Sequence, residues 1–415
     1  MDVRSDKRQF WVILIIVFLG FMGISMPYLI FPSLFLNPLL SILPESWGES
    51  SRAIYLGITL AAYPLGQFIG SPILGSLSDD YGRKNLLSAS LVLSALCYLL
   101  TGFAIDWHHL ELLILSRFVA GFMEGNIAIA RAMAADIVTI SKHESFGKIN
   151  AVSSIAFLVG PLLGGLMSDS DVSHFFSAST PFYFICLLFL FLSGITIRVL
   201  KESIAILVKV KRSFWQRINL PRRLSLLFLD KHLRFLMITS TCFTLAVDIF
   251  YEFGPVYLTV KWILSPAQLV LYNGVVCIAL AIGNAWLPHY ISPRISVQKA
   301  IIYSMAGFAV SLIGIVVTSS TFVMIFLFIL NGLTIGLVST LATVQISNAA
   351  SDDIQGEVMG TQVSLRVLGD AIICLFGGVL LLFSPKLILI FASIISVIAM
   401  IYYKNNHQKK CVTLS

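Results

Sequence analysis

Long apolar runs set the strongest limit on what this chain can fold into. About twelve runs of roughly 20 residues recur along the 415 residues and leave no room for a sizeable aqueous domain. Such a run, as a helix, crosses a hydrocarbon core of about 30 Å, and lipid forces the backbone to satisfy its hydrogen bonds internally. Only 12% of the residues are charged, against roughly 25% in soluble domains. We therefore expect an all-α integral membrane protein. The expected spans are residues 10–32, 53–77, 85–105, 110–138, 149–168, 181–199, 235–260, 267–290, 299–318, 321–347, 358–382 and 386–403.

The distribution of basic residues predicts the orientation, because Lys and Arg in short loops stay on the cytoplasmic side. The tails and the odd-numbered loops carry most of them, whereas the opposite side shows only Arg52, Lys261 and Lys386. Both termini are therefore expected in the cytoplasm, in a multi-pass protein of the cell inner membrane. The net charge of +7 is assigned to topology and the lipid surface, so no nucleic-acid partner is expected. The first run lacks a small-residue cleavage site, and we expect it to stay in the membrane as a helix.

The chain divides into two halves that echo each other. We expect an N-terminal six-helix bundle at 1–200, a basic cytoplasmic linker at 201–234, a C-terminal bundle at 235–403 and a cytoplasmic tail at 404–415. Matched residues in the second and eighth spans are Tyr55/Tyr272, Gly57/Gly274 and Gly66/Gly283, and LLGGL at 162–166 matches LFGGV at 375–379. These matches predict two pseudo-symmetric bundles. Repeats of this kind build transporters that hold substrate near the membrane midplane.

A charged loop, GSLSDDYGRK at 75–84, joins the second and third spans. It resembles the loop signature of the major facilitator superfamily, G-x-L-x-D-x-x-G-R-K, which implies the fold of that family. The resemblance implies that Asp79 lies near the start of the eleventh span and that the loop latches the halves in the outward-facing state. We expect Gly75 to let helices approach, Gly82 to permit a tight turn, and Arg83 and Lys84 to hold the loop in the cytoplasm.

The loop departs from the signature at one position, and a second role is open to it. Asp80 occupies a position where the family usually has Arg, so the local charge balance differs. The alternative to a latch is a solvated turn that only fixes topology.

Two further elements extend the resemblance over the whole chain. LSRFVAGFMEG at 115–125 resembles the R-x-x-x-G element of the fourth helix, with Arg117 and Gly121. AFLVGPLLGG at 156–165 is similar to the fifth-helix element of the drug:proton antiporter branch, which includes tetracycline and multidrug efflux pumps. It keeps Gly160, Pro161, Gly164 and Gly165, with Ala156 where the first Gly is usual. The kink and close packing that these residues permit could seal the cytoplasmic half against leak. The alternative is an ordinary small-residue packing face.

Ionisable residues within the spans are candidates for proton coupling or substrate binding, because charge at membrane depth is costly. In the fourth span, Arg117, Glu124 and Arg131 follow at seven-residue steps and share one helix face. Glu124 falls near the middle of the membrane, where a carboxylate can carry a proton. The alternative is a static ionic ladder that holds this helix to its neighbours.

The seventh span offers a second acidic pair, Asp248 and Glu252, with no basic residue nearby in the sequence. These carboxylates suit a proton-coupled step or recognition of a cationic ligand. The alternative is that Asp248 pairs with Arg117, Arg131 or Arg366. In the eleventh span, Arg366 and Asp370 lie four residues apart and are expected to pair with each other. The first span contains no acidic residue between positions 10 and 32.

The sequence gives no sign of an enzyme, a metal site or a cofactor. The cysteines lie singly, no CxxC or HxxxH spacing occurs, and no GxxxxGK[ST] loop is present to bind ATP. We expect a secondary transporter, driven by the proton gradient, that exports a small amphipathic molecule in exchange for protons. A proton-coupled importer or metabolite, sugar or siderophore carrier is the first alternative, and a non-transporting receptor or scaffold the second. The expected partners are the substrate, protons and lipid, with the chain as a monomer.

Overall fold

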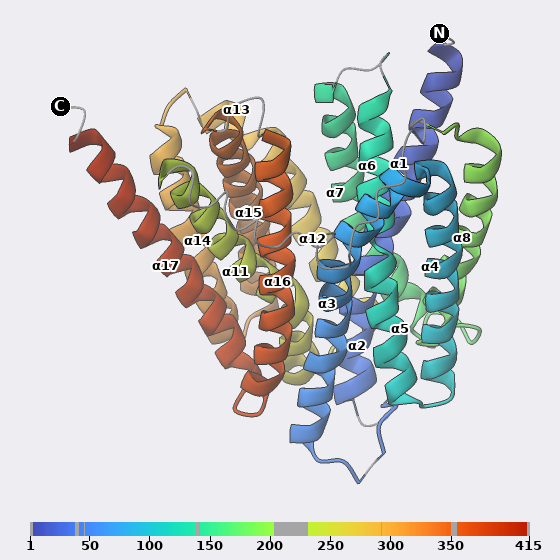
Figure 1. Ribbon diagram of the computed structural model, residues 1–415. Coiled ribbons are helices and arrows are strands. Elements are labelled where there is room, and N and C mark those ends of the chain that lie inside the picture. Colours follow the sequence, from blue (N-terminus) through green and yellow to red (C-terminus); the bar gives the residue numbers. More distant parts are fainter. Residues whose placement is uncertain are drawn as a thin grey trace. The chain divides into compact units, whose positions relative to one another are not determined.

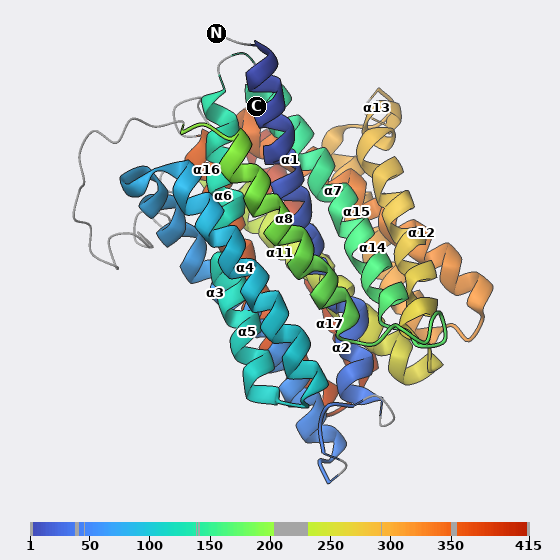
Figure 2. The same ribbon diagram turned by 90° about the vertical axis from the view of Figure 1, so that its right-hand side faces the viewer.

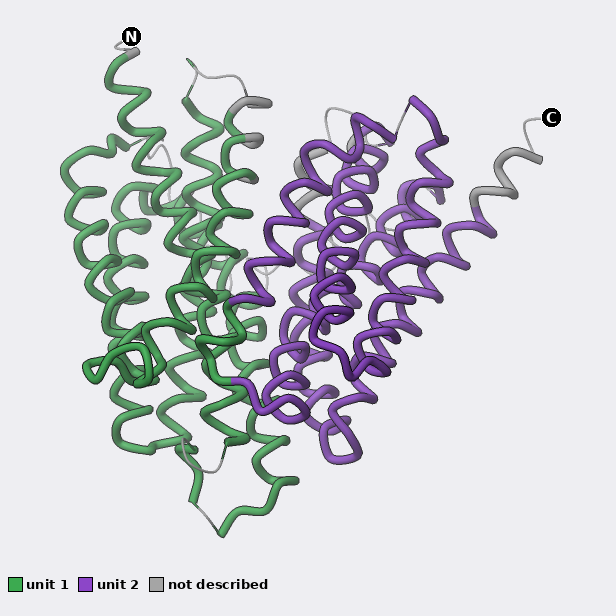
Figure 3. Tube along the Cα trace, turned by 180° about the vertical axis from the view of Figure 1, so that it is seen from behind, with its two compact units in different colours: residues 1–219, 265–270 green, residues 220–264, 271–415 purple. Residues whose placement is uncertain are grey.

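The computed structural model describes residues 3–37, 41–44, 46–137, 139, 142–202, 231–291, 293–349 and 355–412. Every regular element in these residues is a helix (Figure 1). The chain separates into two compact units, residues 1–219 with 265–270, and residues 220–264 with 271–415 (Figure 3). The predicted all-α fold class is confirmed.

Unit 1 holds the helices of the first six expected spans. These are α1 (Val3–Ser25), α2 (Pro27–Leu36), α3 (Glu49–Tyr81), α4 (Arg83–Asp106), α5 (Leu110–Met123), α6 (Gly125–Asp136), α7 (Lys142–Met167) and α8 (Thr180–Val199). In this unit α3 packs against α5, α4 against α8, and α1 against α7 (Figure 2).

Unit 2 holds the other six spans, apart from the first residues of α12, which cluster with unit 1. Its helices are α11 (Lys231–Trp262), α12 (Pro266–Ala285), α13 (Leu287–Ile291), α14 (Val297–Val317), α15 (Thr321–Ala349), α16 (Gln355–Leu381) and α17 (Pro385–Val412). Here α11 packs against α16 and α17, and α14 against α15 and α17.

The helix lengths agree with the expected spans. Among the described residues, 11 helical stretches are long and apolar enough to cross a membrane, and Ala151–Met167 is a shorter apolar stretch of the fifth span. The side of the membrane on which the termini lie stays a prediction. Residues 203–230 of the expected linker and 413–415 of the tail lie outside the described residues.

Two expected spans are each built from two helices. The first span breaks at Met26, because Pro27 has no backbone N–H to continue the helical hydrogen bonds of α1. The fourth span breaks at Glu124, whose own N–H bonds to the Gly121 carbonyl three residues earlier at 3.0 Å. The break therefore places a charged residue at the junction of α5 and α6.

The repeat predicted from matched glycines has a structural counterpart in each unit. A Cβ atom at Gly66 of α3 would collide with the backbone of Phe118 in α5, and a Cβ at Gly283 of α12 would collide with the backbone of Leu333 in α15. The second helix of each half thus lies against the fourth helix of the same half, at equivalent glycines. Close approach of this kind requires small residues.

Candidate functional site

The charged loop between α3 and α4 is a single-residue turn. Gly82 has φ of 95°, a conformation that favours glycine, and it ends α3 and begins α4. The side chain of Arg83 pairs with Asp136 at the end of α6. Glu202 accepts hydrogen bonds from the backbone N–H groups of Arg83 at 2.8 Å and Lys84 at 3.1 Å. Within unit 1 the loop is therefore fixed to α6 and to the residues that follow α8.

Three other residues of the loop, Gly75, Asp79 and Asp80, differ in what the structure shows of them. Among the described residues, a Cβ at Gly75 would have no atom within 4 Å, and the expectation that this glycine lets helices approach stays a prediction. Asp80 is buried, with 6% of its surface exposed. The side chain of Asp79 lies outside the described residues, and its position near the eleventh span stays a prediction.

The fifth-span element forms a close packing face in α7. Cβ atoms at Gly160 and Gly164 would crowd the carbonyl oxygens of Met22 and Met26 in the first span, at 2.6 and 2.7 Å. A Cβ at Gly165 would lie 2.7 Å from the carbonyl oxygen of Pro266 in the segment 265–270, which clusters with unit 1. Pro161 lies inside α7 between these glycines. These contacts match the packing alternative; the sealing role stays a prediction.

Glu124 is buried within unit 1 and bonded at one carboxylate oxygen only. It exposes 4% of its surface, and its Oε2 atom accepts a hydrogen bond of 2.5 Å from the hydroxyl of Tyr63 in α3. Its Oε1 atom is buried without a hydrogen-bond partner. The carboxylate therefore has capacity for one more donor or for a proton.

The two arginines of the fourth span contact aromatic rings. The guanidinium carbon of Arg117 lies 4.4 Å from the centroid of the Tyr63 ring and 5.8 Å from that of Phe31. The guanidinium carbon of Arg131 lies 5.7 Å from the centroid of the Phe21 ring. Buried nitrogens of both residues, Nε and Nη1 of Arg117 and Nε of Arg131, have no hydrogen-bond partner.

Neither arginine is ion-paired with Glu124. In the part of the chain that the structure describes, none of the three residues makes an N···O contact within 4.0 Å of an opposite charge. The described residues therefore show no salt bridge of the static ionic ladder considered for this helix. Glu124 and the two arginines thus lie along α5 and α6 without a salt bridge between them in the described residues.

Asp248 of α11 has a basic partner, and of the three arginines named in the alternative it is Arg366. Arg366 of α16 donates to Asp248 through Nε at 3.0 Å and Nη2 at 2.8 Å, a bidentate contact. The prediction that Asp248 is poorly compensated is wrong, because helix packing brings an arginine that lies 118 positions away in the sequence. The ion pair that the structure describes for Arg366 is with Asp248, and the expected pairing of Arg366 with Asp370 stays a prediction.

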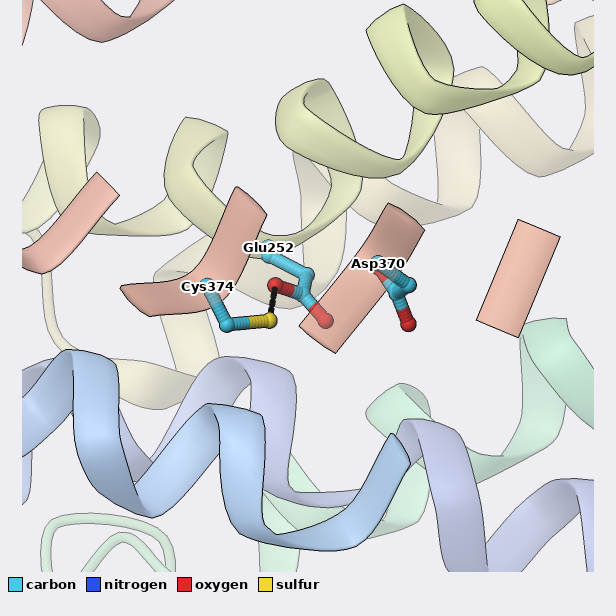
Figure 4. Close-up of side chains that lie close together, drawn as sticks. All are labelled: Glu252, Asp370 and Cys374. Carbon is cyan, nitrogen blue, oxygen red and sulfur yellow. Dashed lines mark hydrogen bonds between the residues drawn. The ribbon is translucent and has the colours of Figure 1, made fainter. Parts of the chain in front are cut away.

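The other acidic residue of α11 meets a thiol. Glu252 exposes 2% of its surface, and its Oε2 atom accepts a hydrogen bond of 2.5 Å from Cys374 Sγ (Figure 4). Asp370, one turn before Cys374 on α16, completes a group whose donor atoms all lie within 4.8 Å of one another. Its Oδ1 atom is buried without a hydrogen-bond partner.

Sequence reasoning missed Tyr63 and Cys374. No pattern in the sequence pointed to Tyr63: the structure packs Gly121 on the Tyr63 backbone, Arg117 over its ring and Glu124 on its hydroxyl. Cys374 lies four residues after Asp370 and shares its helix face, but no spacing along the chain links either residue to Glu252.

Comparison with known proteins agrees with this fold. The chain is 36% identical to the tetracycline resistance protein, class H, of Pasteurella multocida over 180 residues, which are 43% of this chain and 40% of that protein. It is 31% identical to the quinolone resistance protein NorA of Staphylococcus aureus over 180 residues, 43% of this chain and 41% of that one. Each of these alignments thus spans about two fifths of the relative's length.

The solved structures give agreement over nearly the whole chain. The crystal structure of a point mutant of the nucleoside transporter NupG superposes with a TM-score of 0.72 at 13% identity and covers 96% of this chain and 99% of that one. Similarity at this identity shows the fold alone. The sequence pattern of the Major Facilitator Superfamily matches residues 13–373, and the chain belongs to that family.

Proposed function

We propose that this transporter exports a small amphipathic molecule in exchange for protons by alternating access, with Glu124 as the proton carrier. The observation that carries the proposal is the environment of Glu124 in the described residues: one oxygen bonds to the Tyr63 hydroxyl, the other has no hydrogen-bond partner there, and the two arginines of the same span have no ion pair there.

This environment offers the carboxylate two alternatives. A charged carboxylate without a cationic partner costs several kcal/mol at membrane depth, so Glu124 must carry a proton or approach an arginine. The Tyr63 hydroxyl can accept from the protonated acid or donate to the charged form, since a hydroxyl does both. A shift of α5 relative to α3 that breaks the Tyr63 hydrogen bond would free the Glu124 side chain to turn toward Arg117 on its own helix, which would favour release of the proton. Helix movement and release of the proton from Glu124 would then occur together.

The relatives support the direction of transport. Their names record resistance to tetracycline and to quinolones. A membrane transporter protects a cell from such compounds by keeping them out, which export achieves and import does not. Both are aromatic compounds with polar groups, and aromatic rings such as Phe31 and Tyr63, which lie beside Arg117, are side chains that can stack on such molecules.

Reconstitution into proteoliposomes tests the proposal. Tetracycline or a quinolone is supplied with an imposed proton gradient, and the wild type should move the compound against its own gradient until a protonophore is added. Glu124→Gln should retain exchange down a gradient and lose uphill transport. Glu111→Gln is the matched control on α5, because that side chain is 84% exposed, and it should behave as the wild type.

The outcomes separate the alternatives. Accumulation in the opposite direction would identify an importer. Absence of any proton-dependent flux across a wide compound panel would favour a receptor or scaffold. Uphill transport by Glu124→Gln at the wild-type rate would show that the proton is carried elsewhere.

A further inference from the structure

The group formed by Glu252, Asp370 and Cys374 has the composition of a metal site. It offers two carboxylates and one sulfur, from α11 and α16 of the same unit, and its donor atoms all lie within 4.8 Å of one another (Figure 4). We propose that it binds a thiophilic divalent cation of the class of Zn²⁺, Co²⁺ or Cd²⁺.

Two of the oxygens in this group are poorly satisfied. Asp370 Oδ1 is fully buried and has no hydrogen-bond partner. Glu252 is almost fully buried, and its one hydrogen bond in the described residues comes from a thiol, which is a weak donor. Buried carboxylates are otherwise protonated, paired with cations or bound to metal ions.

Nearby charge does not replace a metal ion. The Arg366 guanidinium is engaged in a bidentate contact with Asp248, which neutralises that carboxylate. Among the described residues, neither Glu252 nor Asp370 forms an ion pair with an arginine or a lysine. A divalent cation would compensate both carboxylates at once.

The sulfur decides which cation fits. Mg²⁺ and Ca²⁺ require six or more oxygen ligands, whereas Zn²⁺ and related ions bind a mixture of thiolate and carboxylate in a four-coordinate shell. Ligand atoms around such an ion lie roughly 3.5 Å apart, given bonds of about 2.0–2.3 Å. Small side-chain rotations would therefore close the group around the ion. Binding converts the thiol to a thiolate, and its proton leaves to the solution, with a water molecule as a fourth ligand.

The proposal does not depend on proton-coupled export, because Glu124 belongs to the other unit. The ion would bind the carboxylates of Glu252 and Asp370 and so link α11 to α16. Metal binding can thus be measured on the purified protein without any transport assay.

The experiment is a titration of the purified full-length protein with Co²⁺ in detergent. His407 and Cys411 lie four residues apart in the sequence and could bind the ion independently, so every protein carries Cys411→Ser. A thiolate-to-cobalt charge-transfer band should appear, Zn²⁺ should remove it, and excess Mg²⁺ should not. Cys242→Ser on α11 is the matched control and should keep the band.

Three variants decide the result. Cys374→Ser should abolish the charge-transfer band, and Glu252→Gln and Asp370→Asn should each weaken Co²⁺ affinity at least tenfold. Absence of the band in the protein that carries Cys411→Ser alone, or a band that persists when Cys374→Ser is added, would overturn the proposal. If Cys374→Ser fails to fold, the carboxylate variants decide. Unchanged Co²⁺ affinity in both Glu252→Gln and Asp370→Asn would overturn the proposal, since each variant keeps Cys374 and replaces a carboxylate with an amide of the same shape.

Discussion

The hydroxyl of Tyr63 and the carboxylate of Glu124 are joined by a hydrogen bond of 2.5 Å, although the residues lie 61 positions apart. This bond links α3 to the junction of α5 and α6 at the point where the fourth span is broken. Any movement that separates these helices must remove it, so the protonation of Glu124 and the packing of unit 1 are coupled.

Removal of the Tyr63 hydroxyl should weaken coupling more than binding. Tyr63→Phe keeps the ring beneath Arg117 and deletes one hydrogen bond, worth about 1 kcal/mol, or roughly a fivefold effect. We expect the rate of proton-driven uphill transport to fall about fivefold while downhill exchange changes little. Paired flux assays measure both rates. Tyr55→Phe, on the same helix, is the control; equal losses in both assays would indicate a binding role for Tyr63.

The pair of Asp248 and Arg366 should show strong coupling in a double-mutant cycle. Arg366→Gln leaves the buried Asp248 carboxylate without its bidentate partner and should reduce stability by about 1–3 kcal/mol. Adding Asp248→Asn removes that charge and should recover part of the loss. Thermal unfolding in detergent measures the effect, with Lys299→Gln as an exposed control. Strict additivity would show that the contact is energetically unimportant.

The contact between α3 and α5 should tolerate no side chain at Gly121. A Cβ there would collide with the Tyr63 backbone, and Gly121→Ala should destabilise the protein by about 1–3 kcal/mol. Gly75→Ala is the matched control, because its Cβ would meet no atom within 4 Å and alanine favours the helix by about 0.5–1 kcal/mol. The expected order of unfolding temperatures is Gly75→Ala at or above the wild type, and Gly121→Ala below it.

Neutralisation of Asp79 should impair transport without affecting insertion. If the loop at 75–84 latches the halves, Asp79→Asn removes the carboxylate that would face the start of the eleventh span, where the helix dipole favours negative charge. Membrane expression and flux are measured together, with Glu49→Gln at the exposed start of α3 as control. Normal flux at normal expression would remove the gating role.

The sequence alone determined the class of the protein, its spans and its repeat. Run length and charge distribution suffice for this, because lipid permits few structures and a 20-residue apolar run has one stable form in it. The matched glycines Gly66 and Gly283 also predicted the repeat, since close helix contact demands small residues wherever it recurs. The loop signature located the turn at Gly82 for another reason, because a backbone φ of 95° favours glycine.

Only the tertiary structure decided the partners of the ionisable groups. Spacing shows which residues share a face of one helix, as with Arg366 and Asp370, but not which face of another helix lies opposite. Packing of α11 against α16 brings Arg366 into contact with Asp248, and Cys374 into contact with Glu252. Packing of α3 against α5 gave Tyr63 to Glu124. Those choices depend on the rotation and separation of helices distant in the sequence, which the apolar pattern that forms each helix does not encode.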